Sequence, residues 1–182
     1  PYTTLFRSDP DALGKGDLKT ALELVELVRE STGLEIGVAA FPEVHPESPD
    51  MQHDSKVLAL KQAAGASFAV TQLFFSVGAY TDLVVSAREA GATLPIVPGV
   101  MPIANAKQVV RMAELSGAAI PPELLARFDA AKDDAEARAI GMAYSTQLAV
   151  DLVAAGAPGI HIFSLNHHVA AIELARGAGL CR

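Results

Sequence analysis

The chain has 182 residues, of which 51% are hydrophobic and 19% are charged, a composition typical of a globular domain with a sizeable core. Its net charge of −7 argues against a nucleic-acid surface, which would need a basic stripe. No apolar run reaches the ~18 residues of a membrane span. The single cysteine, Cys181, excludes an internal disulfide and a cysteine-rich metal site. We therefore expect a cytoplasmic protein with no nucleic-acid or membrane partner.

The first eight residues, Pro1 to Ser8, do not share the pattern that follows. They resemble the translation of a widely used sequencing adaptor. We expect residues 1–8 to be an adaptor scar and residues 9–182 to form one partial domain. Because an initiating Met is also absent, we interpret the chain as a fragment.

From Leu18 onward, helical periods alternate with short apolar runs. Helices are expected to begin near Leu18, Asp54, Tyr80, Asn105, Pro121, Ala135 and His168. Strands are expected at Leu34–Phe41, Phe68–Phe75, Leu94–Met101 and Ile160–Leu165. Each strand is apolar on both faces, and helices separate the strands, which together indicate parallel βα units.

Two architectures could contain such units, an open doubly wound sheet and a (β/α)8 barrel. No Gly-x-Gly-x-x-Gly follows any expected strand, which argues against a dinucleotide-binding sheet. Polar residues instead gather at the carboxyl ends of strands, where barrel enzymes carry their chemistry. They are Glu43, His45, Thr71, Gln72, Asn166 and His167. A full barrel takes ~250 residues, so the sequence predicts half of a (β/α)8 TIM barrel with four parallel strands.

The segment 41–54 concentrates acidic and imidazole side chains in a proline-rich loop. Glu43, His45 and His53 could serve as ligands for zinc or iron. The segment could also be a solvated loop in which Asp54 caps a helix, or part of a site for an organic ligand. The residues alone leave all three interpretations open.

For two glutamines and a histidine, the residues alone likewise allow either a structural role or a role in ligand binding. Gln72 lies in an otherwise apolar strand, and because an unpaired buried amide costs ~1–3 kcal/mol, it is either bonded by its neighbours or held for a ligand. Gln108 lies three residues after Asn105, as in a capping box. His167, at a strand-to-helix turn, is of a kind more often found at the surface or as a cap.

Taken together, the motifs resemble the methylenetetrahydrofolate reductase family. The matching pieces, in family order and spacing, are AAFPEVHPE at 39–47, residues 54–61, AGA at 64–66, VTQLFF at 70–75, PGVMP at 98–102, Asn105 with Gln108, and SLN at 164–166. The resemblance covers about residue 20 to the end and makes this chain the C-terminal half of the barrel.

This resemblance implies an FAD enzyme that reduces 5,10-methylenetetrahydrofolate to 5-methyltetrahydrofolate, with NADH or NADPH as reductant. It implies no metal, and it allows a homo-oligomer of the intact enzyme. The first four strands of the barrel, with the glutamate that serves the family as general acid, are not in this sequence. A non-catalytic flavin- or folate-binding half-barrel is one alternative. A metal-dependent barrel hydrolase is another, and rests on Glu43, His45 and His53 alone.

The resemblance assigns five residues to the flavin: Ala21, Phe41, His45, Asp54 and Lys61. The Lys61 ammonium suits a pyrophosphate, and the Asp54 carboxylate could accept sugar hydroxyls.

The resemblance assigns three further residues to the folate. Gln72 and Gln108 match directly, and His167 stands where the family often has arginine. Asp9 falls at the spacing of a family aspartate near flavin N1, where a carboxylate would lower the potential of the ring.

Overall fold

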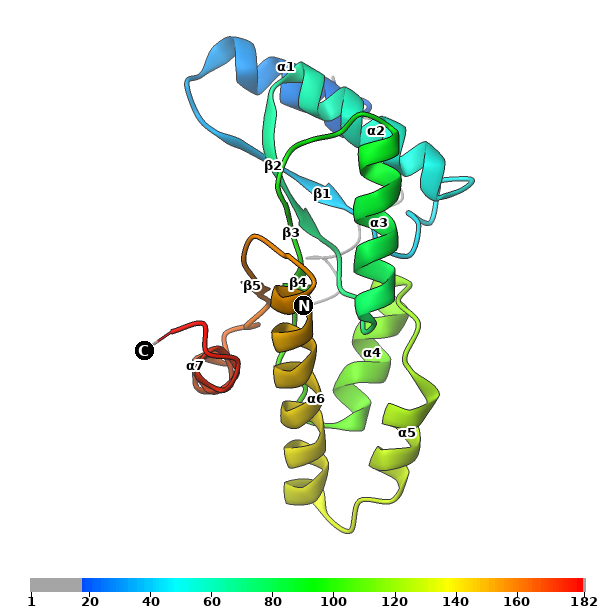
Figure 1. The fold of residues 1–182 in the computed structure, drawn as a ribbon, viewed down its shortest axis with the longest axis vertical. Helices are drawn as coiled ribbons and strands as arrows, with labels where there is room; N and C mark the ends of the chain where they lie inside the picture. Colours follow the sequence, from blue (N-terminus) through cyan, green and yellow to red (C-terminus); the bar gives the residue numbers. More distant parts are fainter. Residues whose placement is uncertain (1–17, 182) are drawn as a thin grey trace.

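The computed structural model describes residues 18–181, and helices and strands alternate along them (Figure 1). The elements are α1 (Ala21–Ser31), β1 (Ile36–Ala40), α2 (Met51–Ala64), β2 (Ala66–Thr71), α3 (Val77–Glu89), β3 (Ile96–Val97), β4 (Gly99–Val100), α4 (Ala106–Ser116), α5 (Pro122–Asp129), α6 (Asp134–Ala154), β5 (His161–Ile162) and α7 (His168–Gly177). In these residues β1 pairs with β2, β2 with β3, and β4 with β5, and every pair is parallel. The expected α/β fold of parallel strands joined by helices is confirmed.

The third expected strand, 94–101, is divided at Pro98 into β3 and β4, which belong to separate sheets. Proline has no N–H to donate to a neighbouring strand, so the ladder cannot continue through this residue. The Pro98 carbonyl instead accepts the N–H of His161 at 2.9 Å, at the start of β5. The fourth expected strand, 160–165, is shortened to His161–Ile162. Within residues 18–181, five short strands therefore stand where four were expected.

Helix α2 begins earlier than expected, because Asp50 caps it. The Asp50 carboxylate accepts the N–H of His53 at 2.7 Å, which satisfies one of the unpaired donors of the first turn. The expectation that this helix opens at Asp54 is therefore wrong, and Asp54 is not its cap. Asp54 lies within the first turn, where its carboxylate is available to a different partner.

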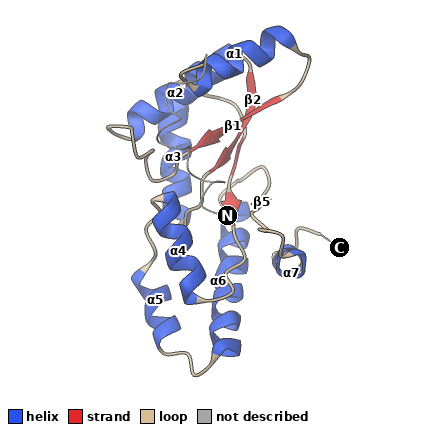
Figure 2. Ribbon diagram, turned by 180° about the vertical axis from the view of Figure 1, so that it is seen from behind, coloured by secondary structure: helices blue, strands red, loops and turns tan. Residues whose placement is uncertain are grey.

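The two faces of the strands differ in exposure. Ile36, Ala69 and Ile96 are buried in the core that the strands share with the helices. Gly37 and Ala39 of β1 are exposed. Although the strand is apolar on both faces, one face of β1 is therefore uncovered in the described part of the chain. Figure 2 shows the strands in red, with α2 and α3 alongside and α4 to α6 extending away from the sheets.

Two glycines allow aromatic rings from neighbouring strands to lie against the backbone. A Cβ atom on Gly37 would lie 2.5 Å from the ring of Phe68, its cross-strand partner. A Cβ atom on Gly99 would overlap the ring of Phe163, and it would lie 2.8 Å from the Thr71 carbonyl oxygen. Any larger residue at either position would have to displace a ring.

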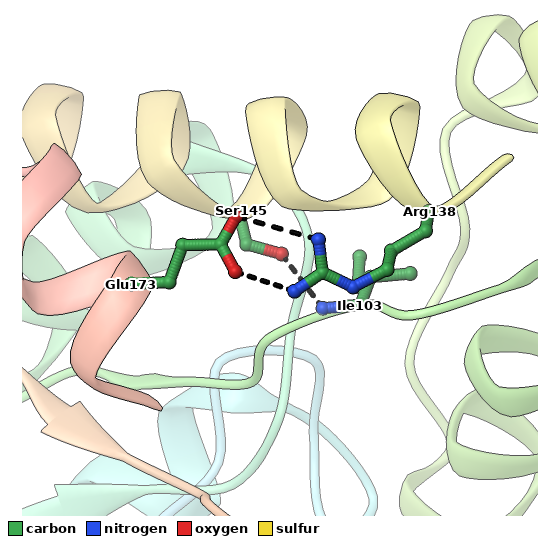
Figure 3. Close-up of polar contacts among 4 residues, drawn as sticks. All are labelled: Ile103, Arg138, Ser145 and Glu173. Carbon is green, nitrogen blue, oxygen red and sulfur yellow. Dashed lines mark hydrogen bonds and ion pairs between the residues drawn. The ribbon is translucent and has the colours of Figure 1, made fainter. Parts of the chain in front are cut away.

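Helix α6 holds two segments that are far apart in the sequence, the one around Ile103 and helix α7 (Figure 3). The hydroxyl of Ser145 accepts the N–H of Ile103 at 3.1 Å and donates to the carbonyl of Gly141 at 2.9 Å. Arg138 forms an ion pair with Glu173 of α7, in which both terminal nitrogens of its guanidinium group, Nη1 and Nη2, donate to the carboxylate. These contacts hold the segment before α4 and helix α7 against the same helix. No helix in residues 18–181 is both long and apolar enough to cross a membrane.

Candidate functional site: two pockets at the strand ends

A pocket of about 440 Å³ lies between α1, the end of β1 and α2, and is called here the α1–α2 pocket. All five residues that the family resemblance assigned to the flavin line it: Ala21, Phe41, His45, Asp54 and Lys61. Helix α1 starts beside it because the Thr20 hydroxyl accepts the N–H of Glu23 at 3.3 Å. Residues up to 40 positions apart in the chain are thus gathered around one space.

The loop after β1 is fixed by the first turn of α2. The Asp54 carboxylate accepts the backbone N–H of His45 at 2.7 Å, which leaves its second oxygen available. The Nδ1 atom of His45 accepts the N–H of Glu47 at 3.1 Å, so a neutral imidazole carries its proton on Nε2. The rings of Phe41 and His45 meet edge to face, with their centroids 4.6 Å apart.

Lys61 lies two turns of α2 beyond Asp54 and therefore on nearly the same side of the helix. Burial lowers the pKa of the Lys61 amine, and the nearby Asp54 carboxylate partly opposes that effect. No acceptor within hydrogen-bond distance of its ammonium is found among the described residues. A half-buried cation in this position is suited to an anionic ligand such as a phosphate.

A second pocket, of about 780 Å³, lies between α4 and the start of α7 and is called here the α4–α7 pocket. Gln108 and His167 both line it. The Asn105 carboxamide caps α4 by accepting the N–H of Gln108 at 2.8 Å, as expected. Gln108 in turn accepts the N–H of Ala104 at 2.7 Å, so its oxygen has a structural role. Among the described residues its Nε2 reaches only the sulfur of Met101, at 3.7 Å, which is a weak acceptor.

The turn before α7 has unusual backbone geometry. Leu165 and Asn166 have φ of 46° and 66°, a left-handed conformation that L residues seldom adopt. The next residue, His167, occupies the N-cap position of α7 but makes no side-chain cap bond. Its exposed imidazole is therefore available at the mouth of the α4–α7 pocket.

Gln72 follows the carboxyl end of β2 and lines neither pocket. Its backbone N–H donates to the Ala40 carbonyl at 2.8 Å, which extends the pairing of β1 with β2. Its side-chain oxygen accepts the N–H of Leu73 at 2.9 Å. Its Nε2 has no partner among the described residues, so part of its hydrogen-bonding capacity is unfilled there.

The residues that suggested a metal site do not form one. Within residues 18–181 no group of three or more His, Cys, Asp or Glu side chains is placed to hold an ion. The Glu43 carboxylate accepts the N–H of Ala119 at 2.9 Å instead, and burial raises its pKa against the opposing effect of that bond. The metal-dependent hydrolase therefore has no structural support in this region. Asp9 lies outside the described residues.

Sequence reasoning missed part of the α4–α7 pocket. Arg111, Met112 and Leu115 of α4 line it together with Gln108, and Arg138 of α6 lies at its edge. Positions three, four and seven residues after Gln108 fall on the same face of a helix as Gln108 itself. That spacing could have identified these residues once Gln108 was singled out.

Comparison with known proteins decides the family. The model of the methylenetetrahydrofolate reductase family matches residues 7–179. The chain belongs to this family. The 5,10-methylenetetrahydrofolate reductase of Escherichia coli is 36% identical over 170 residues, which cover 91% of this chain and 56% of that protein. The methylenetetrahydrofolate reductase (NADH) 1 of Arabidopsis thaliana is 36% identical over 178 residues, 91% of this chain and 30% of the relative. The chain thus spans about half of the bacterial relative and less than a third of the plant one.

A solved structure has the same fold. It is described as an uncharacterized protein from Clostridium thermocellum that binds two copies of 5-methyl-5,6,7,8-tetrahydrofolic acid. The TM-score is 0.64 with 16% sequence identity, over 99% of this chain and 68% of that one. At this identity the likeness shows the fold alone.

Proposed function

We propose that this chain is part of the catalytic barrel of an FAD-dependent 5,10-methylenetetrahydrofolate reductase, which forms 5-methyltetrahydrofolate with NAD(P)H as reductant in cytoplasmic one-carbon metabolism. One observation carries the proposal. Five residues that match flavin positions of the family, spread from Ala21 to Lys61, line a single pocket of about 440 Å³. Family membership and the names of the relatives agree with it.

The α1–α2 pocket fits part of FAD chemically. Lys61 offers a half-buried ammonium, without a hydrogen-bond acceptor among the described residues, to the pyrophosphate. The oxygen of Asp54 that does not bind His45 would accept a sugar hydroxyl. The edge-to-face pair of Phe41 and His45 offers a rigid, partly apolar wall. When bound, FAD supplies the hydride chemistry that the side chains themselves lack.

The α4–α7 pocket is proposed to take the folate. Gln108 presents an amide nitrogen that has only a sulfur acceptor, and His167 presents an exposed imidazole. Met112 and Leu115 supply apolar surface for the aromatic parts of a folate. The fold neighbour that binds 5-methyl-5,6,7,8-tetrahydrofolic acid favours the same ligand class. Gln72, whose Nε2 is unfilled among the described residues, is proposed to bind the pterin.

We further propose that the strands are four consecutive positions in the wall of a (β/α)8 barrel, with β3 and β4 sharing one position. The exposure of Gly37 and Ala39 on β1 supports this, because barrel closure would cover that face. In the described residues β1 and β5 each pair along one edge only. The remaining strands would complete the wall and carry the general-acid glutamate. Asp9 keeps its proposed role of tuning the flavin potential.

Flavin binding by the purified chain tests the proposal. We expect FAD fluorescence to be quenched on titration with the chain, with saturation at one FAD per chain. Lys61→Met should weaken the binding by about tenfold or more, since a charge-assisted contact is lost. As a control, Lys107→Met removes an exposed cation of α4 that lies outside both pockets and should bind FAD like the wild type. If the folded wild-type chain leaves FAD fluorescence unchanged, the cofactor assignment is wrong.

The uncovered face of β1 also favours a second candidate, a flavin- and folate-binding half-barrel without turnover. The two differ in one measurement. A complete barrel that contains this chain should oxidise NAD(P)H and reduce 5,10-methylenetetrahydrofolate, whereas a binding module would bind both ligands and show no turnover.

A further inference from the structure

The loop between β1 and α2 contains a strained residue. Val44 has φ of 66°, in the left-handed region, where a β-branched side chain is a genuine outlier. Such a conformation persists only where the surrounding contacts impose it. Val44 lies between Phe41 and His45, both of which line the α1–α2 pocket. The contacts that impose this turn therefore also determine where two pocket residues lie.

On the carboxyl side of Val44, the turn is held by local bonds and by α2. The His45 N–H donates to Asp54 at 2.7 Å, and the Ser48 N–H donates to the His45 carbonyl at 2.8 Å. The Glu47 N–H donates to His45 Nδ1 at 3.1 Å. These bonds fix the loop after Val44 but do not restrain the residues before it.

On the amino side, the restraint comes from Glu43. Its Oε2 accepts the N–H of Ala119 at 2.9 Å, in the segment between α4 and α5, 76 positions away in the sequence. Glu43 is half-buried, and that burial raises its pKa. It does not line the α1–α2 pocket, so it is not placed to contact a ligand there. Its bond to Ala119 thus crosses from the loop after β1 to the segment that follows α4, the helix that carries Gln108.

We propose that Glu43 is a positioning residue. By accepting the N–H of Ala119 it holds the left-handed turn at Val44, and so fixes Phe41 and His45 against the α1–α2 pocket. Its effect on FAD rests on the proposed function, whereas its effect on the loop does not. The same bond ties this loop to the segment that follows α4, and α4 is a helix that lines the α4–α7 pocket.

Amide hydrogen exchange of the folded chain, without added FAD, tests the effect on the loop. Glu43→Ala should speed exchange at His45, Glu47 and Ser48 by about threefold to tenfold, as expected for the loss of one partly exposed hydrogen bond. Glu43→Asp keeps the charge but is one methylene shorter, so it should resemble Glu43→Ala. Glu43→Gln keeps the reach and an accepting oxygen, and should resemble the wild type. Glu89→Ala, which removes an exposed acid at the end of α3, is the control.

The FAD dissociation constant is then measured for the same variants. Glu43→Ala and Glu43→Asp should bind about threefold to tenfold more weakly than the wild type, and Glu43→Gln should bind normally. If Glu43→Ala does not fold, the comparison of Glu43→Asp with Glu43→Gln decides. Unchanged exchange in Glu43→Asp, or equally fast exchange in Glu43→Gln, would overturn the inference. Failure of the wild-type chain to bind FAD would refute the cofactor assignment, and exchange would still test Glu43.

Discussion

Replacement of Gly141 by alanine should destabilise the chain although alanine is the better helix former. Gly141 is buried in α6, against the segment that precedes α4. A Cβ atom there would overlap the carbonyl oxygen of Ile103 and lie 2.8 Å from the Ile103 Cγ2 atom. Because the obstructing oxygen belongs to the backbone, a rotamer change cannot relieve the contact. Helix α6 and the 101–105 segment must move apart.

Three effects set the magnitude. Overpacking a well-packed site costs ~1–3 kcal/mol. Moving the helix away also weakens the bond from the Ile103 N–H to Ser145, now 3.1 Å long and buried, and an unpaired buried donor costs ~1–3 kcal/mol. The gain in helix propensity returns only ~1 kcal/mol. We expect a net loss of about 2–4 kcal/mol, or a fall in Tm of roughly 5–15 °C for a chain of this size.

Urea and thermal unfolding followed by circular dichroism would measure this loss. Gly159→Ala is the matched control, since a Cβ there meets nothing within 4 Å and its backbone is not left-handed. The control should lie within ~0.5 kcal/mol of the wild type. If Gly141→Ala unfolds at the same urea concentration as the control, the close approach of α6 to Ile103 does not constrain the fold, and the reasoning is refuted.

Three further predictions concern function. Burial lowers the pKa of Lys61 in the folded chain, so the unfolded chain binds the proton more tightly and the charged amine opposes folding at neutral pH. Lys61→Met should therefore raise the Tm slightly while it weakens FAD binding. A lower Tm in thermal unfolding would contradict this. Gln72→Leu in a complete barrel should weaken folate binding at least fivefold, through one lost amide contact, and leave the FAD dissociation constant within twofold; unchanged folate kinetics would make Gln72 a structural amide. The chain alone, with one sheet face uncovered at β1, should self-associate in sedimentation experiments and show no reductase turnover. Turnover should appear when the rest of the barrel is co-expressed with it. A monomer of the chain alone with full turnover would disprove this.

Much of the fold could be predicted because two signals in the sequence are physical and local. Apolar strand runs separated by helices require parallel pairing, and the three observed strand pairs are parallel. Strand ends were less predictable. Pro98 lies in an apolar run, and its missing N–H divides the strand only because a new neighbour, β5, pairs from that point.

Part of the candidate site could also be predicted. The residues assigned to the flavin from a family pattern do line one pocket, although their contacts with a cofactor stay a prediction. The start of α2 was predicted wrongly because Asp50 and Asp54 are both good caps, four residues apart, and only the geometry shows that Asp50 caps the helix by accepting the N–H of His53. The contact of Glu43 with Ala119 could not be predicted, because it joins loops 76 positions apart.

The exposed face of β1 bears on the proposed barrel. Residues of β1 are apolar on both sides, although only one side is buried among the described residues. On the exposed face of β1, however, a small residue stands beside a large one, Gly37 of β1 beside Phe68 of β2. Gly99 of β4, which is buried, lies beside Phe163 after β5 in a similar way. In the interior of a closed barrel, such pairing of small and large side chains fills a tapering space in layers. An open sheet covered by a helical layer would place no such requirement on two glycines at strand positions, where glycine weakens the strand. The pairing of Gly37 with Phe68, more than the hydrophobicity of either strand, therefore supports the proposal that this face is a barrel interior.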